Sequence, residues 1–203
     1  MFVEPEKLSP RDRYFLMIGC IAPRPIAFVS SLSGDGVRNL APFSYFSGVS
    51  STPPVLSVAI AARRGKPKDT LSNIRETGEF VVNVVPEALA EPMNLASGDY
   101  PPGVDEFAVA GLTPAPSDLV SPPRVRESPI QMECRLLRVV DVGEPPNTTG
   151  LVLGEILRFH LEEGLYRDGH IDPDKLPVIG RMGRQDYCRT ADRFSMKRPK
   201  IEG

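Results

Sequence analysis

The stretch that decides the fold is Ile130-Gln-Met-Glu-Cys-Arg-Leu-Leu-Arg-Val-Val-Asp-Val142. Apolar and polar side chains alternate along its first half, and this period of two is typical of a strand with one buried face. Residues 151–162 (LVLGEILRFHLE) repeat the alternation, which places His160 on the outward face. We therefore expect two long strands. In the first strand the inward set is Ile130, Met132, Cys134 and Leu136, and the outward set is Gln131, Glu133 and Arg135.

Shorter elements precede these two strands. A capping serine and a proline at residues 9–10 predict a helix to about residue 18. The SGDG turn at 33–36 lies between two strand patterns and predicts a hairpin. Pro92 is expected to break or kink a helix over 87–96, and 97–105 is expected to be a loop. The remaining patterns predict strands at 25–32, 38–43, 55–60 and 80–85 and a helix at 70–77.

The composition indicates one globular domain. The 203 residues are 41% hydrophobic and 25% charged, which is ordinary for a folded protein. The 22 prolines and 17 glycines predict many short elements joined by turns. Strands and helices do not alternate regularly, which disfavours a parallel sheet. We expect a mainly β fold, a partly closed antiparallel barrel with several short helices, in a single domain over residues 1–203.

Charge and cysteine content exclude several classes of function. Twenty-four basic and 26 acidic residues give a net charge of −2, without the basic excess that nucleic-acid binding requires. No apolar run approaches the roughly 20 residues of a membrane span, and the first residues are charged, so we expect no membrane partner. Cys20, Cys134 and Cys188 form no CxxC pair, which favours a reducing cytoplasm and no metal site. Cys134 is expected to fill the core.

A phosphate site is one interpretation of the segment around Lys68. This lysine directly precedes the predicted helix, whose first backbone N–H groups attract anions, and Arg63 lies nearby. In the alternative, Asp69 or Thr70 simply caps the helix, and the basic loop before it is solvated. The residues alone leave both interpretations open.

Three further positions point to a ligand. Ser57 lies on a strand face of small residues, which leaves room for a flat molecule. Asn83 stands among apolar residues, so its amide needs a partner, either a structural one, which is more common, or a ligand. Pro42 interrupts a strand and indicates an edge or bulge where backbone groups can face a ligand.

Short motifs along residues 10–199 occur in the order typical of one known family. They are PRPIA (23–27), NLAPFS (39–44), VSSTPP (49–54), KDTL (68–71), NIRETGEFVVN (73–83), PPRVRESP (122–129), GE (154–155) and PVIGR (177–181). As a set they resemble the flavin reductase-like FMN-binding split-barrel family, flavoredoxin type. The resemblance implies a six-stranded antiparallel Greek-key split barrel with flanking short helices. It also implies a homodimer with FMN bound near the subunit interface.

The resemblance further implies roles for individual residues. Lys68, Asp69 and Thr70 would hold the FMN phosphate, assisted by Arg63. The isoalloxazine edge would lie along Pro42, Phe43 and Ser44, and the ribityl and ring pocket would include Ser57 and Asn83. Arg181 and the loop around Ser97 are additional candidates.

The implied function is an FMN-binding oxidoreductase, a flavin reductase that passes hydride from NAD(P)H to flavin and on to a small-molecule or protein electron acceptor. Hydride transfer needs no dedicated acid or base, and no serine or cysteine pairs with a nearby histidine, so no catalytic side chain is assigned. One alternative is a flavoredoxin-like electron carrier that uses NAD(P)H inefficiently. Another is a non-enzymatic flavin- or haem-binding protein. The choice between NADH and NADPH, and between bound and exchanging FMN, stays open.

Overall fold

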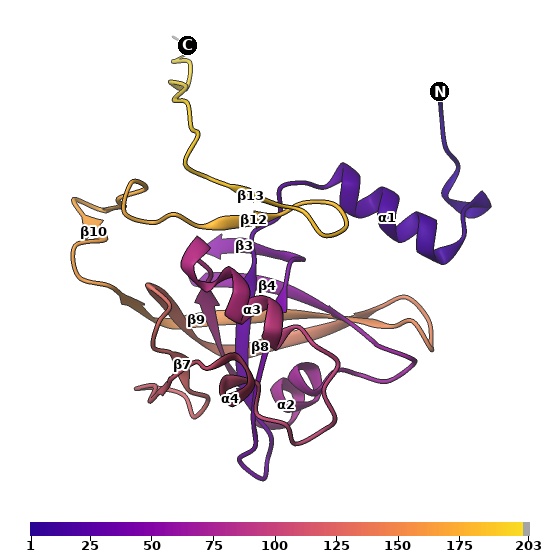
Figure 1. Cartoon of the computed structure of the whole chain (residues 1–203), viewed down its shortest axis with the longest axis horizontal. Coiled ribbons are helices and arrows are strands. Elements are labelled where there is room, and N and C mark those ends of the chain that lie inside the picture. Colours follow the sequence, from indigo (N-terminus) through magenta and orange to yellow (C-terminus); the bar gives the residue numbers. More distant parts are fainter. Residues whose placement is uncertain (201–203) are drawn as a thin grey trace.

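A curved antiparallel sheet forms the body of the molecule (Figure 1). The computed structural model describes residues 1–200, so the last three residues of the expected domain, 201–203, lie outside the described residues. Seven strands pair in the order β2-β1-β5-β8-β9-β4-β3. Their bounds are β1 Ala27–Leu32, β2 Arg38–Phe43, β3 Phe46–Ser51, β4 Pro54–Ala61, β5 Glu79–Val84, β8 Ile130–Val142 and β9 Thr149–Leu161.

The connection between β2 and β3 makes the sheet curl. These strands lie at opposite edges of the sheet, yet only Ser44 and Tyr45 separate them in the chain. The three residue steps from Phe43 to Phe46 span at most about 11 Å, so the two edges must approach each other. The Tyr45 carbonyl accepts a hydrogen bond from the Ala59 amide of β4 at 2.8 Å, which holds the corner against the opposite edge. The result is a barrel with a gap between β2 and β3.

Most of the predicted strands are confirmed, but the sheet has seven strands where six were expected. The additional strand is β3, whose sequence FSGVSS is rich in serine and glycine and almost entirely exposed. An exposed edge strand needs no apolar alternation, which explains why its sequence carries no strand signal. The predicted hairpin is confirmed, because β1 pairs with β2 from Ala27 opposite Phe43 to Leu32 opposite Arg38.

The barrel interior is filled by apolar side chains from every part of the sheet. Leu56, Val58 and Ile60 of β4 point inward against Phe80 of β5. Cys134 is fully buried among them, so its expected role as core filler is confirmed. Burial of such side chains contributes about 1.5–3 kcal/mol each.

One helix, α2 (Asp69–Thr77), also contributes to the barrel core. Its side chains Leu71 and Ile74 pack among the inward-facing strand residues. The helix ends at Gly78, whose φ of 73° is the left-handed conformation that favours glycine. Because β5 begins at the next residue, this glycine cap fixes the angle between α2 and the sheet.

A second apolar cluster lies outside the barrel, where α3 (Ala90–Ala96) and α4 (Glu106–Ala110) cover the outer face of β1 and β2. Phe28 and Leu40 of the strands pack there against Phe107 of α4. The predicted break at Pro92 was misplaced. A short 3-10 helix, η2 (Glu87–Leu89), precedes α3, and Pro92 lies in the first turn of α3, where its missing N–H costs nothing.

Gln131, Glu133 and His160 were expected on the outward face of their strands, but the structure shows that this face is covered by other parts of the chain. Glu133 is fully buried, where its carboxylate accepts hydrogen bonds from the Asp118 and Leu119 amides and pairs with His160 at 2.5 Å. Gln131 is also buried. The alternation itself holds, but the proline-rich residues 112–129 cross the polar face and cover it. They include the small pair β6 (Pro114–Ala115) and β7 (Arg124–Val125).

The first residues and the last described residues of the chain lie on the same side of the barrel (Figure 1). Helix α1 (Pro10–Cys20) follows the 3-10 helix η1 (Pro5–Lys7), and its predicted cap is confirmed, since Ser9 Oγ accepts from the Asp12 amide at 3.1 Å. In residues 1–200 no helix has both the length and the apolar character that a membrane span needs. The late hairpins are β10 (Tyr166–Arg167) with β11 (His170–Ile171) and β12 (Ile179–Arg181) with β13 (Tyr187–Arg189).

We predict that Gly154→Ala destabilises the barrel. A Cβ at Gly154 of β9 would lie 2.3 Å from Cζ of Phe80, and because this ring is fully buried, any shift of it disturbs the packed core. Overpacking of this kind costs about 1–3 kcal/mol in the free energy of unfolding, measured by urea denaturation. Gly48→Ala is the matched control, since nothing lies within 4 Å of its Cβ position. Equal stability of the two variants would contradict this account of the core.

Candidate functional site

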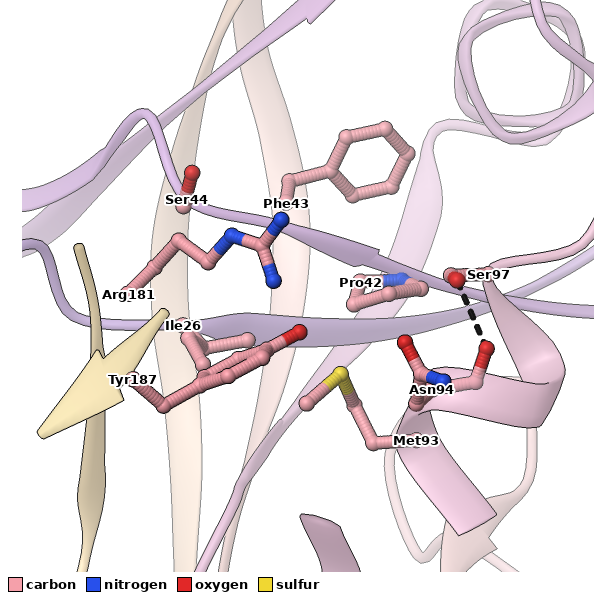
Figure 2. Close-up of a pocket in the computed structure, with 9 residues that line it drawn as sticks. All are labelled: Ile26, Pro42, Phe43, Ser44, Met93, Asn94, Ser97, Arg181 and Tyr187. Carbon is pink, nitrogen blue, oxygen red and sulfur yellow. Dashed lines mark hydrogen bonds between the residues drawn. The ribbon is translucent and has the colours of Figure 1, made fainter. Parts of the chain in front are cut away.

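Two adjoining cavities meet at the end of β2. The larger, of about 500 Å³, lies between residues 63–70 and 96–102. The smaller, of about 180 Å³, lies between the end of β2, the end of α3 and the β12–β13 hairpin (Figure 2). Pro42 and Ser97 line both cavities, so together they form one trough.

The start of α2 forms one wall of the larger cavity. Its N-cap is Lys68, and no side chain caps the helix, so the first backbone N–H groups have no side-chain acceptor. The alternative in which Asp69 or Thr70 caps the helix is therefore wrong. Lys68, Asp69 and Thr70 all line the cavity, as does Arg63. Free N–H groups beside two cations make this end of the trough suitable for an anion.

A buried hydrogen-bond network holds α2 in this place. The Thr70 hydroxyl donates to Asn39 Oδ1 of β2 at 2.7 Å, which explains why it does not cap the helix. Asn39 Nδ2 donates in turn to Glu106 of α4 at 3.0 Å, and the Leu40 amide donates to the same carboxylate oxygen at 3.0 Å. Thr70 is only 1% exposed, so the network is shielded from water. It therefore holds α2, β2 and α4 in fixed positions around the cavity.

Lys68 is the cation best placed to meet an anion. Its ammonium lies 5.2 Å from the centre of the Phe43 ring, in cation–π contact. Burial, and next the charge of Arg63, lower the pKa of Lys68 below its ordinary value, while Asp99 acts in the opposite direction. A bound anion would relieve the repulsion between the two cations.

Asp99 connects two loops across the larger cavity. Its carboxylate pairs with Arg63 at 3.1 Å and with Arg64 at 3.2 Å. All three side chains line the cavity and are at least two-fifths exposed. The carboxylate of Asp99 therefore balances the charge of the two arginines with an anionic group of the protein itself.

The smaller cavity is a narrow space with apolar walls and a polar edge. Pro42, Phe43 and Ser44, which the resemblance places along a flavin ring edge, line this cavity (Figure 2). Arg181 faces them from the hairpin, with its guanidinium 4.4 Å from the centre of the Tyr187 ring. Arg181 also donates a hydrogen bond to the Arg184 carbonyl. The rest of the lining comes from Ile26 and from Met93, Asn94 and Ser97 at the end of α3.

Ser57 and Asn83 line neither cavity. Asn83 is fully buried, where its amide donates to the Phe28 carbonyl at 2.9 Å and accepts from the Val125 amide at 2.8 Å. The structure thus gives Asn83 structural partners. Ser57 lies on the outer face of β4, and its hydroxyl donates to the Ser47 carbonyl of β3 at 3.4 Å. The other seven predicted site residues line the trough, whereas Ser57 and Asn83 lie outside it.

The sequence indicated Arg181 and the Ser97 loop as additional candidates, and both line the smaller cavity. Asp99 belongs to that loop and lines the larger cavity, whereas Asn94 and Tyr187 were missed. No local pattern marks them, because they reach the trough only through the packing of α3 and of the late hairpin. Tyr187 had one indirect signal, its position shortly after the PVIGR motif.

Comparisons with known proteins agree with this geometry. Residues 19–175 match the model of the flavin reductase like domain family. The structure of nitrilotriacetate monooxygenase component B from Bacillus cereus superimposes with a TM-score of 0.94 at 37% identity, covering 97% of this chain and 98% of that one. The structure of the Pseudomonas fluorescens 2-nitrobenzoate 2-nitroreductase NbaA superimposes with a TM-score of 0.89 at 34% identity, covering 98% of this chain and 96% of that one.

A more distant structure shares the fold. It is a Shewanella frigidimarina protein described as a flavin reductase with a split barrel domain, with a TM-score of 0.85 at 23% identity over 98% of this chain and 100% of that one. The gap between β2 and β3, the trough beside it and a family match over most of the chain lead to one conclusion. The chain belongs to the flavin reductase-like family of split-barrel proteins.

Proposed function

We propose that this protein is an FMN-binding oxidoreductase that takes hydride from NAD(P)H and passes the electrons to an acceptor. The observation that carries the proposal is the trough, which has a helix start without a side-chain cap beside Lys68 at one end and a cavity with apolar walls and a polar edge at the other. Its two ends match the two ends of FMN, a phosphate and a planar ring. Flavin reductase-like relatives support the redox class.

The residues present fit FMN. The phosphate would accept hydrogen bonds from the backbone N–H groups of Asp69 and Thr70 and from Lys68, with Arg63 close by. Asp69 contributes through its backbone, since its own carboxylate would repel a phosphate. The ring would lie against Pro42 and Phe43, and its polar edge would face Ser44.

Bound flavin supplies the redox chemistry by accepting a hydride, that is two electrons and one proton, from the nicotinamide, which leaves as NAD(P)⁺. The protein's own groups position the reactants. Phe43 and Met93 give the smaller cavity apolar walls that exclude water. Ser44 and Arg181 present hydrogen-bond donors at its edge.

The acceptor in this proposal is a small molecule or a partner protein. One similar structure is a component of a monooxygenase, which supports a second protein as the acceptor. Another is a 2-nitrobenzoate nitroreductase, which supports a nitro compound as the acceptor. We also propose a homodimer. Phe159 and Val142 on the two long strands are each more than half exposed, and Leu137 is half exposed, so a second copy has an apolar surface to cover.

The decisive experiment is anaerobic reduction. The protein loaded with FMN should lose its yellow absorbance when NADH or NADPH is added, and stopped-flow traces should show which donor is faster. Heat-denatured protein with the same free FMN is the control. Slow bleaching by both donors, with rapid reduction by dithionite, would identify an electron carrier and overturn the reductase proposal. Absence of FMN binding would overturn both functions.

Lys68→Gln should weaken FMN binding and leave riboflavin binding nearly unchanged. Riboflavin lacks the phosphate, and a charge-assisted hydrogen bond is worth ~1.5–3 kcal/mol, roughly tenfold or more in affinity. FMN affinity should also fall with rising pH, because a phosphate prefers the protonated lysine and the pKa of free Lys68 is lowered. Fluorescence titrations of both flavins measure this, with the distant Lys7→Gln as control. Equal losses for the two flavins would contradict the phosphate assignment.

Asp99→Asn should strengthen FMN binding. The substitution frees Arg63 and Arg64 from two half-exposed ion pairs worth up to ~1 kcal/mol, so we expect an increase of about threefold. Riboflavin affinity should not change. Asp174→Asn, which breaks an ion pair with Arg193 outside the trough, is the matched control. A weaker affinity for FMN in Asp99→Asn would show that Asp99 orients the arginines and does not compete with the phosphate.

A further inference from the structure

Arg24 is a buried cation whose contacts join three parts of the chain. It is only 4% exposed, between the end of α1 and the late hairpin. Its Nη1 donates to the Ile18 carbonyl at 2.6 Å and to the Ile21 carbonyl. Its Nη2 donates to the Met182 carbonyl at 2.8 Å. Two of the three guanidinium nitrogens therefore donate hydrogen bonds to these backbone carbonyls.

The third nitrogen connects Arg24 to the smaller cavity. Arg24 Nε donates to Ser44 Oγ at 3.3 Å, and Ser44 lines that cavity. The serine oxygen is thus an acceptor from a cation. Its hydroxyl hydrogen has no protein acceptor among the hydrogen bonds of residues 1–200, so it is available to a molecule in the cavity. A hydroxyl whose oxygen accepts from a guanidinium is a stronger donor than an isolated one.

The positive charge behind Ser44 is not neutralised. Within residues 1–200, no carboxylate lies within 4.0 Å of the nitrogens of Arg24 or of Arg181. The two arginines are also linked through their backbones, since each amide donates to the carbonyl of the other, at 2.9 and 2.8 Å. Arg181 lines the smaller cavity and Arg24 lies behind Ser44, so two guanidinium groups without a carboxylate partner favour added negative charge at this edge.

We propose that Arg24 is a positioning residue that, through Ser44, makes the smaller cavity prefer reduced over oxidised flavin. The inference rests on the proposed function. Uptake of two electrons and one proton from the donor adds one negative charge to the neutral flavin ring. A donor hydroxyl polarised by Arg24 stabilises that added charge at the ring edge, and it does so only after reduction.

The test measures how tightly the protein binds each form of FMN. Dissociation constants for oxidised FMN and for dithionite-reduced FMN, the latter under argon, give a ratio that corresponds to the shift in flavin potential. Ser44→Ala should lower the preference for reduced FMN about tenfold, which is about 30 mV for a two-electron couple. Arg24→Lys, which keeps the charge but loses the fixed geometry, should lower it in the same direction.

A double-mutant cycle distinguishes a positioning role of Arg24 from a general structural role. In the Ser44→Ala background, Arg24→Lys should have little further effect on the ratio, because the hydroxyl through which it acts is gone. Thr190→Val is the matched control. It removes another anchor of the same hairpin, the 2.9 Å hydrogen bond from Thr190 to the Val178 carbonyl, and should leave the ratio unchanged.

Three results would overturn the inference: an unchanged ratio in Ser44→Ala, additive effects of the two substitutions, or an equal loss in Thr190→Val. If Arg24→Lys does not fold, the Ser44→Ala ratio alone decides. The proposed function fails separately, because it requires that the wild-type protein bind FMN at all. Wild-type binding with an unchanged Ser44→Ala ratio would therefore reject only the role of Arg24.

Discussion

The two-residue connection between β2 and β3 is the constraint on which the rest of the structure depends. It joins opposite edges of one sheet, so the sheet must curl, and the curl creates the enclosed core and the gap beside it. The same corner contains Ser44, which faces the smaller cavity. A longer connection would let the edges separate and would leave this hydroxyl in solvent. The turn that closes the barrel therefore also positions the polar edge of the site.

The strands and the start of α2 could be predicted because their signals are local. Alternation marked β8 and β9, and the KDTL segment marked the start of α2. Prediction failed where burial depends on distant packing. Glu133 has a solvated pattern, yet residues 112–129 cover it and satisfy its carboxylate. For Asn83 the sequence left a structural partner and a ligand both open, and only the fold shows the two backbone groups that bond to its amide. No neighbour in sequence reveals either partner.

The site residues that the sequence missed share one property. Asn94 reaches the trough from α3, and Tyr187 reaches it from the β12–β13 hairpin. Their roles follow from the way these segments pack against β2, which the sequence of each segment does not encode. Motifs such as PRPIA located Arg24 as part of a family pattern, but only the fold shows that its guanidinium reaches Ser44.

The trough combines a rigid side with an adjustable one. On one side, Thr70, Asn39 and Glu106 form a buried network in which each polar group has a partner, so α2 has little freedom to move. On the other side, Asp99 is held by half-exposed ion pairs, which solvent and salt weaken. In the proposed function, a phosphate can therefore displace Asp99 without disturbing the start of α2. This difference in burial would let the proposed site open for a phosphate while its rigid side keeps the ring oriented.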